Sequence, residues 1–112
     1  MSIFFCRGIL RMIRAVLIEK EIKEILLDIN KIHIIIRGRP TFIGQWPEID
    51  VVIIKAEEGG DYVNPNKLLP PFENEVVRGP ILLVRMDENS EPQDFTVNEY
   101  ESLLRRNERL AA

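Results

Sequence analysis

Chemically versatile side chains are scarce in this sequence, which holds one cysteine, one histidine and one tryptophan. A single cysteine, Cys6, cannot build an internal disulfide framework, so the fold depends on its apolar core. A zinc site needs several cysteine or histidine ligands at defined spacing, and Cys6 and His33 are too few. The sequence also places no nucleophile beside a histidine base. We therefore expect no zinc centre, no cysteine–histidine catalysis and no cofactor.

Long apolar runs and phosphate-binding loops are missing as well. Arg7, Arg11 and Arg14 interrupt the apolar N-terminus, which leaves neither a secretory signal core nor a membrane-spanning run. The adjacent glycines Gly59 and Gly60 lack the further glycine spacing and the lysine of a nucleotide-binding loop. The sequence therefore indicates neither a membrane protein nor a nucleotide-binding enzyme.

Charge is divided unevenly along the chain. Residues 1–39 carry a net charge of +4 and residues 40–112 a net charge of −7, which gives −3 for the whole chain. An acidic chain without a basic stripe binds nucleic acid poorly, because neutralisation of phosphates dominates that affinity. We therefore expect no nucleic-acid partner and no membrane partner.

A chain of 112 residues is long enough for one domain that folds without covalent staples. We assign residues 12–112 to this domain and residues 1–11 to an N-terminal extension. Residues 1–18 are basic and free of acidic side chains, as in a mitochondrial transit segment, but they hold a single serine. Because transit segments are rich in serine, a plain extension is favoured over the transit segment.

The clearest local signal is a helix start at Thr96, after an apolar strand expected over residues 81–86. Thr96 is a good N-cap, and Glu99 stands three residues later, which is the spacing of a capping box. Phe95 and Tyr100 flank the cap at the positions of a hydrophobic staple. Together these residues predict a C-terminal helix.

The sequence predicts the other helices and strands less clearly. Strands are expected at residues 14–18 and 50–56, residues 40–47 read as irregular, and residues 57–79 form a long loop. Residues 22–37 fit a single helix, but their β-branched run Ile34-Ile35-Ile36 favours a strand. A third division places a strand at 22–28 and a short helix at 29–37. Periodicity alone does not choose among them.

Three segments, Thr41–Trp46, Asn64–Phe72 and Arg78–Tyr100, together resemble a family of uncharacterised small domains found in large DNA viruses and single-celled eukaryotes. The resemblance spans roughly residues 12–104 and carries no activity or catalytic residue. It implies two N-terminal strands, a short helix, two central strands and a C-terminal helix. It therefore favours the division with a strand at 22–28, and it suggests a cytoplasmic or virion-associated location.

We predict an α+β fold: a small mixed sheet of about four strands, with a short helix and a C-terminal helix packed chiefly on one face. The predicted core consists of Val16, Ile18, Val51, Ile53, Leu82, Val84, Tyr100, Leu103 and Leu104.

Two groups of residues are candidate sites. Carboxylates crowd the turn after the last strand, where Asp87, Glu88 and Asp94 are candidate ligands for Mg²⁺ or Ca²⁺; a merely solvated turn is the alternative. The candidate interaction residues are Trp46, Leu68, Leu69 and Phe72. Exposed aromatic and apolar side chains mark binding surfaces, but the same residues would pin the long loop onto the core if buried.

These signals favour a protein that is not an enzyme. We expect an interaction module or a small subunit of a larger assembly, for example a viral one, with a protein partner or a second copy of itself. The alternative is a metal-binding domain or a small metal-dependent enzyme that uses the acidic turn at residues 87–94.

Overall fold

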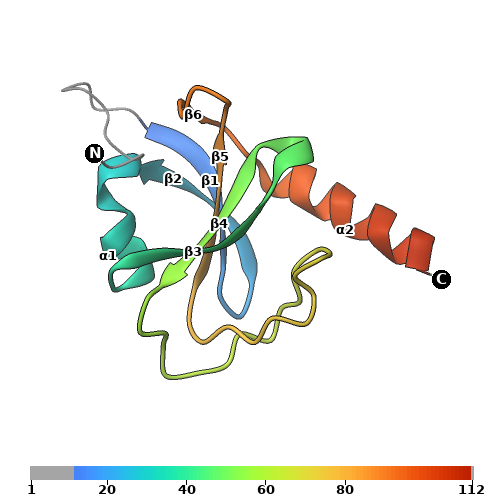
Figure 1. Ribbon diagram of the computed structural model, residues 1–112, viewed down its shortest axis with the longest axis horizontal. Helices are drawn as coiled ribbons and strands as arrows, with labels where there is room; N and C mark the ends of the chain where they lie inside the picture. The colour runs from blue at the N-terminus through green and yellow to red at the C-terminus, as the bar shows by residue number, and fades with distance from the viewer. Residues whose placement is uncertain (1–11, 112) are drawn as a thin grey trace.

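The structure, a computed structural model, describes residues 12–111, which form one sheet of six strands with two helices. The strands are β1 (Met12–Ile18), β2 (Ile22–Asp28), β3 (Pro40–Trp46), β4 (Val51–Ala56), β5 (Ile81–Met86) and β6 (Pro92–Gln93), and the helices are α1 (Ile32–Ile36) and α2 (Val97–Ala111). Short 3-10 turns at Ile29–Lys31 and Pro47–Ile49 precede α1 and β4. The strand order is β2-β1-β5-β4-β3, and β6 pairs with β5 (Figure 1).

The α+β class is confirmed, but the sheet differs from the predicted one. Every strand pair is antiparallel, so the expectation of a mixed sheet was wrong, and there are six strands instead of about four. The strand missed at Pro40–Trp46 carries a register shift between Phe42 and Gly44, where a bulge disrupts the alternation that sequence patterns detect. Pro40 is tolerated because it begins an edge strand.

Residues 22–37 follow the third division, a strand and then a short helix. Asp28 caps the turn after the strand, since its carboxylate accepts a hydrogen bond from the Asn30 amide at 3.0 Å. The left-handed residue that ends α1 is Arg37, with φ of 60°, and not the neighbouring Gly38. Ile32 and Ile36 are buried whereas Ile34 is exposed, so the β-branched run is accommodated with one face of the helix in the core.

The two helices cover opposite faces of the sheet. Ile32 and Ile36 of α1 pack with Leu82 and Val84, on the face that we call the α1 face. The other face, which we call the α2 face, gathers Phe95, Tyr100 and residues of the 57–79 loop. The expectation that both helices lie chiefly on one face was therefore wrong. The reason is that successive side chains of the central strands point to opposite faces and both sets are apolar, so each face needs its own cover.

The predicted core is largely confirmed. Seven of its members are buried, namely Val16, Ile18, Val51, Ile53, Leu82, Val84 and Tyr100. Leu103 and Leu104 are only partly buried, because α2 leaves the body of the domain beyond its first turns (Figure 1).

Candidate functional site

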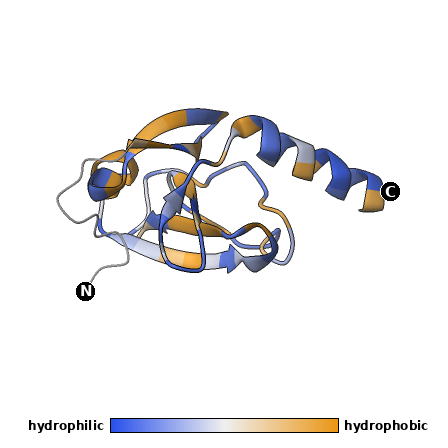
Figure 2. Cartoon of the chain, turned by 90° about the horizontal axis from the view of Figure 1, so that it is seen from above, coloured by the Kyte–Doolittle hydropathy of each residue, from blue (hydrophilic) through white to orange (hydrophobic). Residues whose placement is uncertain are grey.

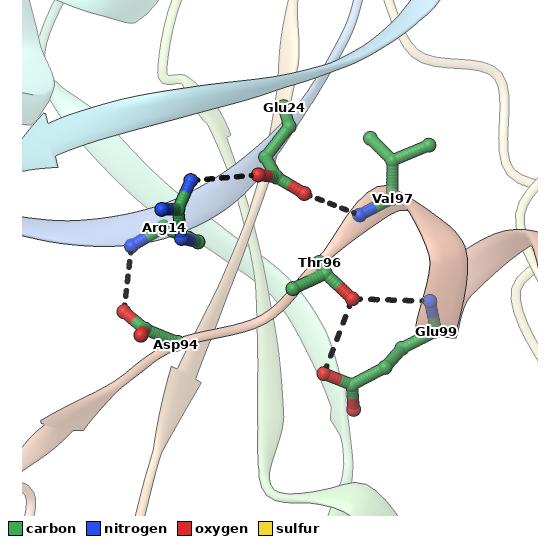
Figure 3. A network of polar contacts seen from close by, with 6 residues as sticks. All are labelled: Arg14, Glu24, Asp94, Thr96, Val97 and Glu99. Carbon is green, nitrogen blue, oxygen red and sulfur yellow. Dashed lines mark hydrogen bonds and ion pairs between the residues drawn. The ribbon is translucent and has the colours of Figure 1, made fainter.

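The first turn of α2 is fixed by the cap that the sequence predicts. The Glu99 amide donates to the Thr96 hydroxyl at 3.2 Å, and that hydroxyl donates to the Glu99 carboxylate at 3.3 Å (Figure 3). The Phe95 and Tyr100 rings lie 6.2 Å apart between centroids, which confirms the hydrophobic staple. The helix start is therefore both capped and packed.

A second set of bonds ties this turn to the sheet. Glu24 on β2 accepts the Val97 amide at 3.1 Å and pairs with Arg14 on β1, also at 3.1 Å (Figure 3). The Arg14 amide donates to Asp94 at 2.8 Å, and the Phe95 amide donates to the Arg14 carbonyl at 2.9 Å. A carboxylate at a helix N-terminus suits both the unpaired amides and the helix dipole. Sequence reasoning missed Glu24, because Val97 lies 73 residues away in the sequence and Lys23 and Asp28 are also charged on the same strand.

Arg85 on β5 supplies a third anchor. Its guanidinium pairs with Glu99 at 2.9 Å and donates to the carbonyls of Ile49 at 3.1 Å and Asp94 at 3.0 Å. It also lies 4.9 Å from the centroid of the Phe95 ring, within cation–π range. Arg85 thus joins the helix start, the turn before β4 and the segment before α2. No pattern in the sequence singled it out.

Tyr100 fills the centre of this arrangement. It is fully buried, and its ring lies 6.1 Å from that of Trp46. Burial raises the pKa of the Tyr100 hydroxyl above its ordinary value, and that hydroxyl has no hydrogen-bond partner among residues 12–111. We call the assembly of Thr96, Glu99 and Tyr100 with its anchors the root of α2.

The distal half of α2 has a different environment. Beyond Tyr100 the apolar side chains become progressively exposed: Leu103 and Leu104 are partly buried, and Leu110 is 80% exposed. Figure 1 shows the helix running outward from the sheet, and hydrophobic positions recur along it to its C-terminal end in Figure 2. A helix of 15 residues is about 22 Å long, so much of it extends past the sheet. We call Leu103, Leu104 and Leu110 the α2 stripe.

The predicted interaction residues lie together on the α2 face. Trp46, Leu68 and Leu69 are buried, and the Trp46 indole donates to the Pro70 carbonyl at 3.1 Å. Phe72 is partly buried and packs edge-on against Trp46, at 6.1 Å between centroids. These contacts are internal and hold the long loop on the core. A role for these residues in partner binding stays a prediction.

Two asparagines complete the attachment of that loop. The Asn64 side-chain amide donates to the carbonyls of Ile18 at 3.0 Å and Gly79 at 2.9 Å. The Asn66 side-chain amide donates to the Glu19 carbonyl at 2.7 Å. Residues 64–69 form no helical turn, so side-chain hydrogen bonds and buried leucines hold this segment in place of regular structure.

The predicted metal ligands do not converge on one point. The Asp87 carboxylate accepts the amides of Asn89 and Glu91, both at 2.9 Å, and the Gln93 side chain at 3.1 Å. Asp94 is directed to β1, and Glu88 is exposed in the turn. Within residues 12–111, no group of three or more His, Cys, Asp or Glu side chains is placed to hold a metal ion. Metal binding stays a prediction that no contact here supports.

The other residues considered for site chemistry are His33 and Cys6. His33 is exposed on α1, and Cys6 lies outside the described residues. In the described part of the chain, neither helix is both long enough and apolar enough to cross a membrane.

The fold defines a small α+β domain with a six-stranded antiparallel sheet and one helix on each face, and the C-terminal helix projects beyond the sheet. A family model for DUF5880, a family of unknown function, matches residues 12–103, and the chain belongs to that family. The match ends within α2, so it includes the root and Leu103. A search of curated proteins and a search of solved structures each find no match.

Proposed function

We propose that the chain is a non-enzymatic protein-interaction module, a small subunit of a larger assembly, which binds its partner through the α2 stripe. The observation that carries this proposal is the contrast along one helix. Its root is held by a cap, Glu24 and Arg85, yet its apolar stripe continues past the core to Leu110. A cytoplasmic or virion-associated subunit, viral or protist in origin, fits such a role.

The anchored root supports this proposal energetically. Binding costs free energy for every segment that must become ordered, so a helix that is already formed and fixed in direction lowers that cost. Amphipathic helices commonly bind by laying their apolar face into a groove of a partner. Leu103 and Leu110 lie seven residues apart on one side of the helix, and Leu104 lies beside Leu103.

Charge specifies the partner further. Helical spacing puts Arg106 on one flank of the stripe and Glu108 on the other, and both are exposed. Arg105 and Arg109 lie on the opposite side of the helix. A fitting partner therefore has an apolar groove with an acidic side next to Arg106 and a basic side next to Glu108.

The experiment compares the full chain with two matched double variants. Leu104→Ser with Leu110→Ser removes two of the three leucines of the stripe, and Arg105→Ser with Arg109→Ser changes the opposite side next to the same positions. Each protein is tagged, used for affinity purification from the native source, and measured by light scattering after size exclusion. Candidate partners are then purified, and their binding to each protein is measured by calorimetry.

The proposal expects a partner that binds the wild-type chain and the arginine variant in purified form but not the leucine variant. A homo-oligomer that the leucine variant alone dissociates would also support it. A wild-type chain that is a monomer at all concentrations, with no purified partner that distinguishes the two variants, would overturn it.

A further inference from the structure

The two edges of the sheet are built differently. In the strand order β2-β1-β5-β4-β3 the outermost strands are β2 and β3. β3 begins with Pro40, which has no amide hydrogen to donate, and its register shifts between Phe42 and Gly44. A proline and a bulge are features that stop an edge strand from pairing with another chain. β2 has neither, and all seven of its residues pair with β1 in one unbroken register.

The outer side of β2 carries free backbone groups. The Arg14 amide donates to Asp94 and the Arg14 carbonyl accepts from Phe95, so both groups of Arg14 point away from β2. Residues of an antiparallel ladder alternate between pairs that exchange hydrogen bonds and pairs that do not. Leu26 pairs with Arg14 and therefore directs its own amide and carbonyl away from β1. The same alternation applies to Ile22, Glu24 and Asp28. Among residues 12–111, no strand pairs with that side of β2.

The charged side chains of β2 are engaged within the domain. Lys23 pairs with Glu19 at 3.6 Å, and Asp28 caps the turn that follows the strand. Glu24 is bound at the root of α2. Charges protect an edge when they stand in the way of an incoming strand. Leu26, in contrast, is 61% exposed. The edge therefore offers a free backbone and an exposed leucine.

We propose that this edge pairs with the same edge of a second copy, antiparallel and centred on Ile25, so that two sheets join into one. In this register Ile22 lies opposite Asp28 of the second copy and Glu24 lies opposite Leu26, so every outward backbone group of β2 finds a partner. Shifting the register by two residues places Glu24 opposite either Glu24 or Asp28 of the second copy, and like charges directly opposite are unfavourable. The sequence of β2 thus selects one two-fold symmetric pairing.

The side chains of the two strands match in this register. On the α1 face Ile25, which is partly buried beside the core, lies opposite Ile25 of the second copy. On the α2 face the two Leu26 side chains are diagonal neighbours, within reach of each other, so the exposed leucine becomes covered. Two paired edge strands bury less surface than a permanent dimer does. We therefore expect a dimer that forms as the protein concentration rises.

The charge at position 26 tests the pairing. Leu26→Glu places like charges opposite Glu24 of the second copy and should weaken association at least several-fold. Leu26→Lys should keep the association, because the lysine then faces Glu24. Val76→Glu adds the same negative charge at a loop position that is 76% exposed, and it is the matched control. Sedimentation of each full chain from micromolar to millimolar concentration measures the association. A wild-type chain that stays monomeric throughout, or an equal effect of all three variants, would overturn the proposal.

Disulfide cross-linking tests the centre of the register. In a Cys6→Ser background, Ile25→Cys places two thiols opposite each other with Cα atoms about 4.5 Å apart, within the range of a disulfide. Lys23→Cys points to the same face, but its two copies would lie about 13 Å apart along the strands and should not cross-link. Oxidation followed by a non-reducing gel measures the cross-link, and circular dichroism checks that each variant is folded. Cross-links at both positions, or at neither, would contradict the register.

Amide exchange separates this edge from the α2 stripe. Protection of the Glu24 and Leu26 amides should rise with protein concentration, whereas the Ile25 amide, which faces β1, should not change. Leu104→Ser with Leu110→Ser should leave this dimer intact, because those residues belong to another surface. If that variant dissociates the dimer and Leu26→Glu does not, the copies meet through α2. The pairing of β2 is then wrong, while the proposed function of the stripe stands.

Discussion

The first turn of α2 buries Tyr100 and is bonded to β2 and β5, whereas the last turn carries a leucine that is 80% exposed. Both ends of the helix carry apolar side chains on the same side, but core contact declines from the buried Tyr100 through the partly buried Leu103 and Leu104 to the exposed Leu110. The difference shows that amphipathic spacing does not by itself say what a helix face packs against. At the root the apolar face stabilises the domain, and at the tip Leu110 is left exposed.

Truncating Tyr100 should give the largest difference between the two ends. Tyr100→Ala removes a fully buried ring between Trp46 and Phe95 and should lower the free energy of unfolding by about 3–5 kcal/mol. Chemical denaturation of the full chain measures it, with Leu110→Ala as the control at the tip. Equal losses in the two variants would mean that the root is not the anchored end.

Removing Arg85 should weaken the root without leaving a large cavity. Arg85→Met loses the pair with Glu99 and the bonds to the carbonyls of Ile49 and Asp94, and should cost about 2 kcal/mol. Amide exchange should speed up at Val97 to Tyr100 more than in the central strands. If exchange rises uniformly over the sheet, Arg85 supports the whole domain and not the root in particular.

The root was the part of the molecule that sequence reasoning read best. Thr96, Glu99 and the Phe95–Tyr100 staple act within a few residues, so local spacing predicts them. Glu24 and Arg85 contact the same turn from strands that are distant in the sequence, and local spacing does not predict such long-range contacts.

The tip and the sheet show where local patterns fail. Leu103 and Leu104 have the spacing of core residues, yet they are only partly buried. Their burial depends on the direction in which α2 leaves the sheet, and that direction is set by the contacts of the root. β3 was missed because the bulge after Phe42 interrupts the alternation of apolar and polar residues. The central strands are apolar on both faces, which indicates burial but does not predict that each helix covers a different face.

Replacing the Tyr100 hydroxyl should strengthen the root slightly. The hydroxyl is buried and finds no hydrogen-bond partner in the described part of the chain, so Tyr100→Phe should raise the free energy of unfolding by about 1 kcal/mol. Its pKa is raised by burial, so above about pH 10 the unfolded chain loses this proton while the folded chain keeps it. Wild-type stability should therefore fall as pH rises through that range, and less steeply in the variant. Identical slopes in denaturation series at pH 8 to 11 would contradict a buried Tyr100.

The smallest effect on stability is expected at the tip. Leu110→Ser should change the free energy of unfolding by less than about 0.5 kcal/mol, because an exposed side chain loses few contacts, and Leu104→Ser should fall between it and Tyr100→Ala. Denaturation curves of the three variants at one protein concentration measure this gradient. A large loss for Leu110→Ser would mean that the tip is packed in solution. Repeating the denaturation curves at higher protein concentration then shows what packs against Leu110. If a second copy does, the loss of unfolding free energy depends on protein concentration; if another part of the same chain does, it does not.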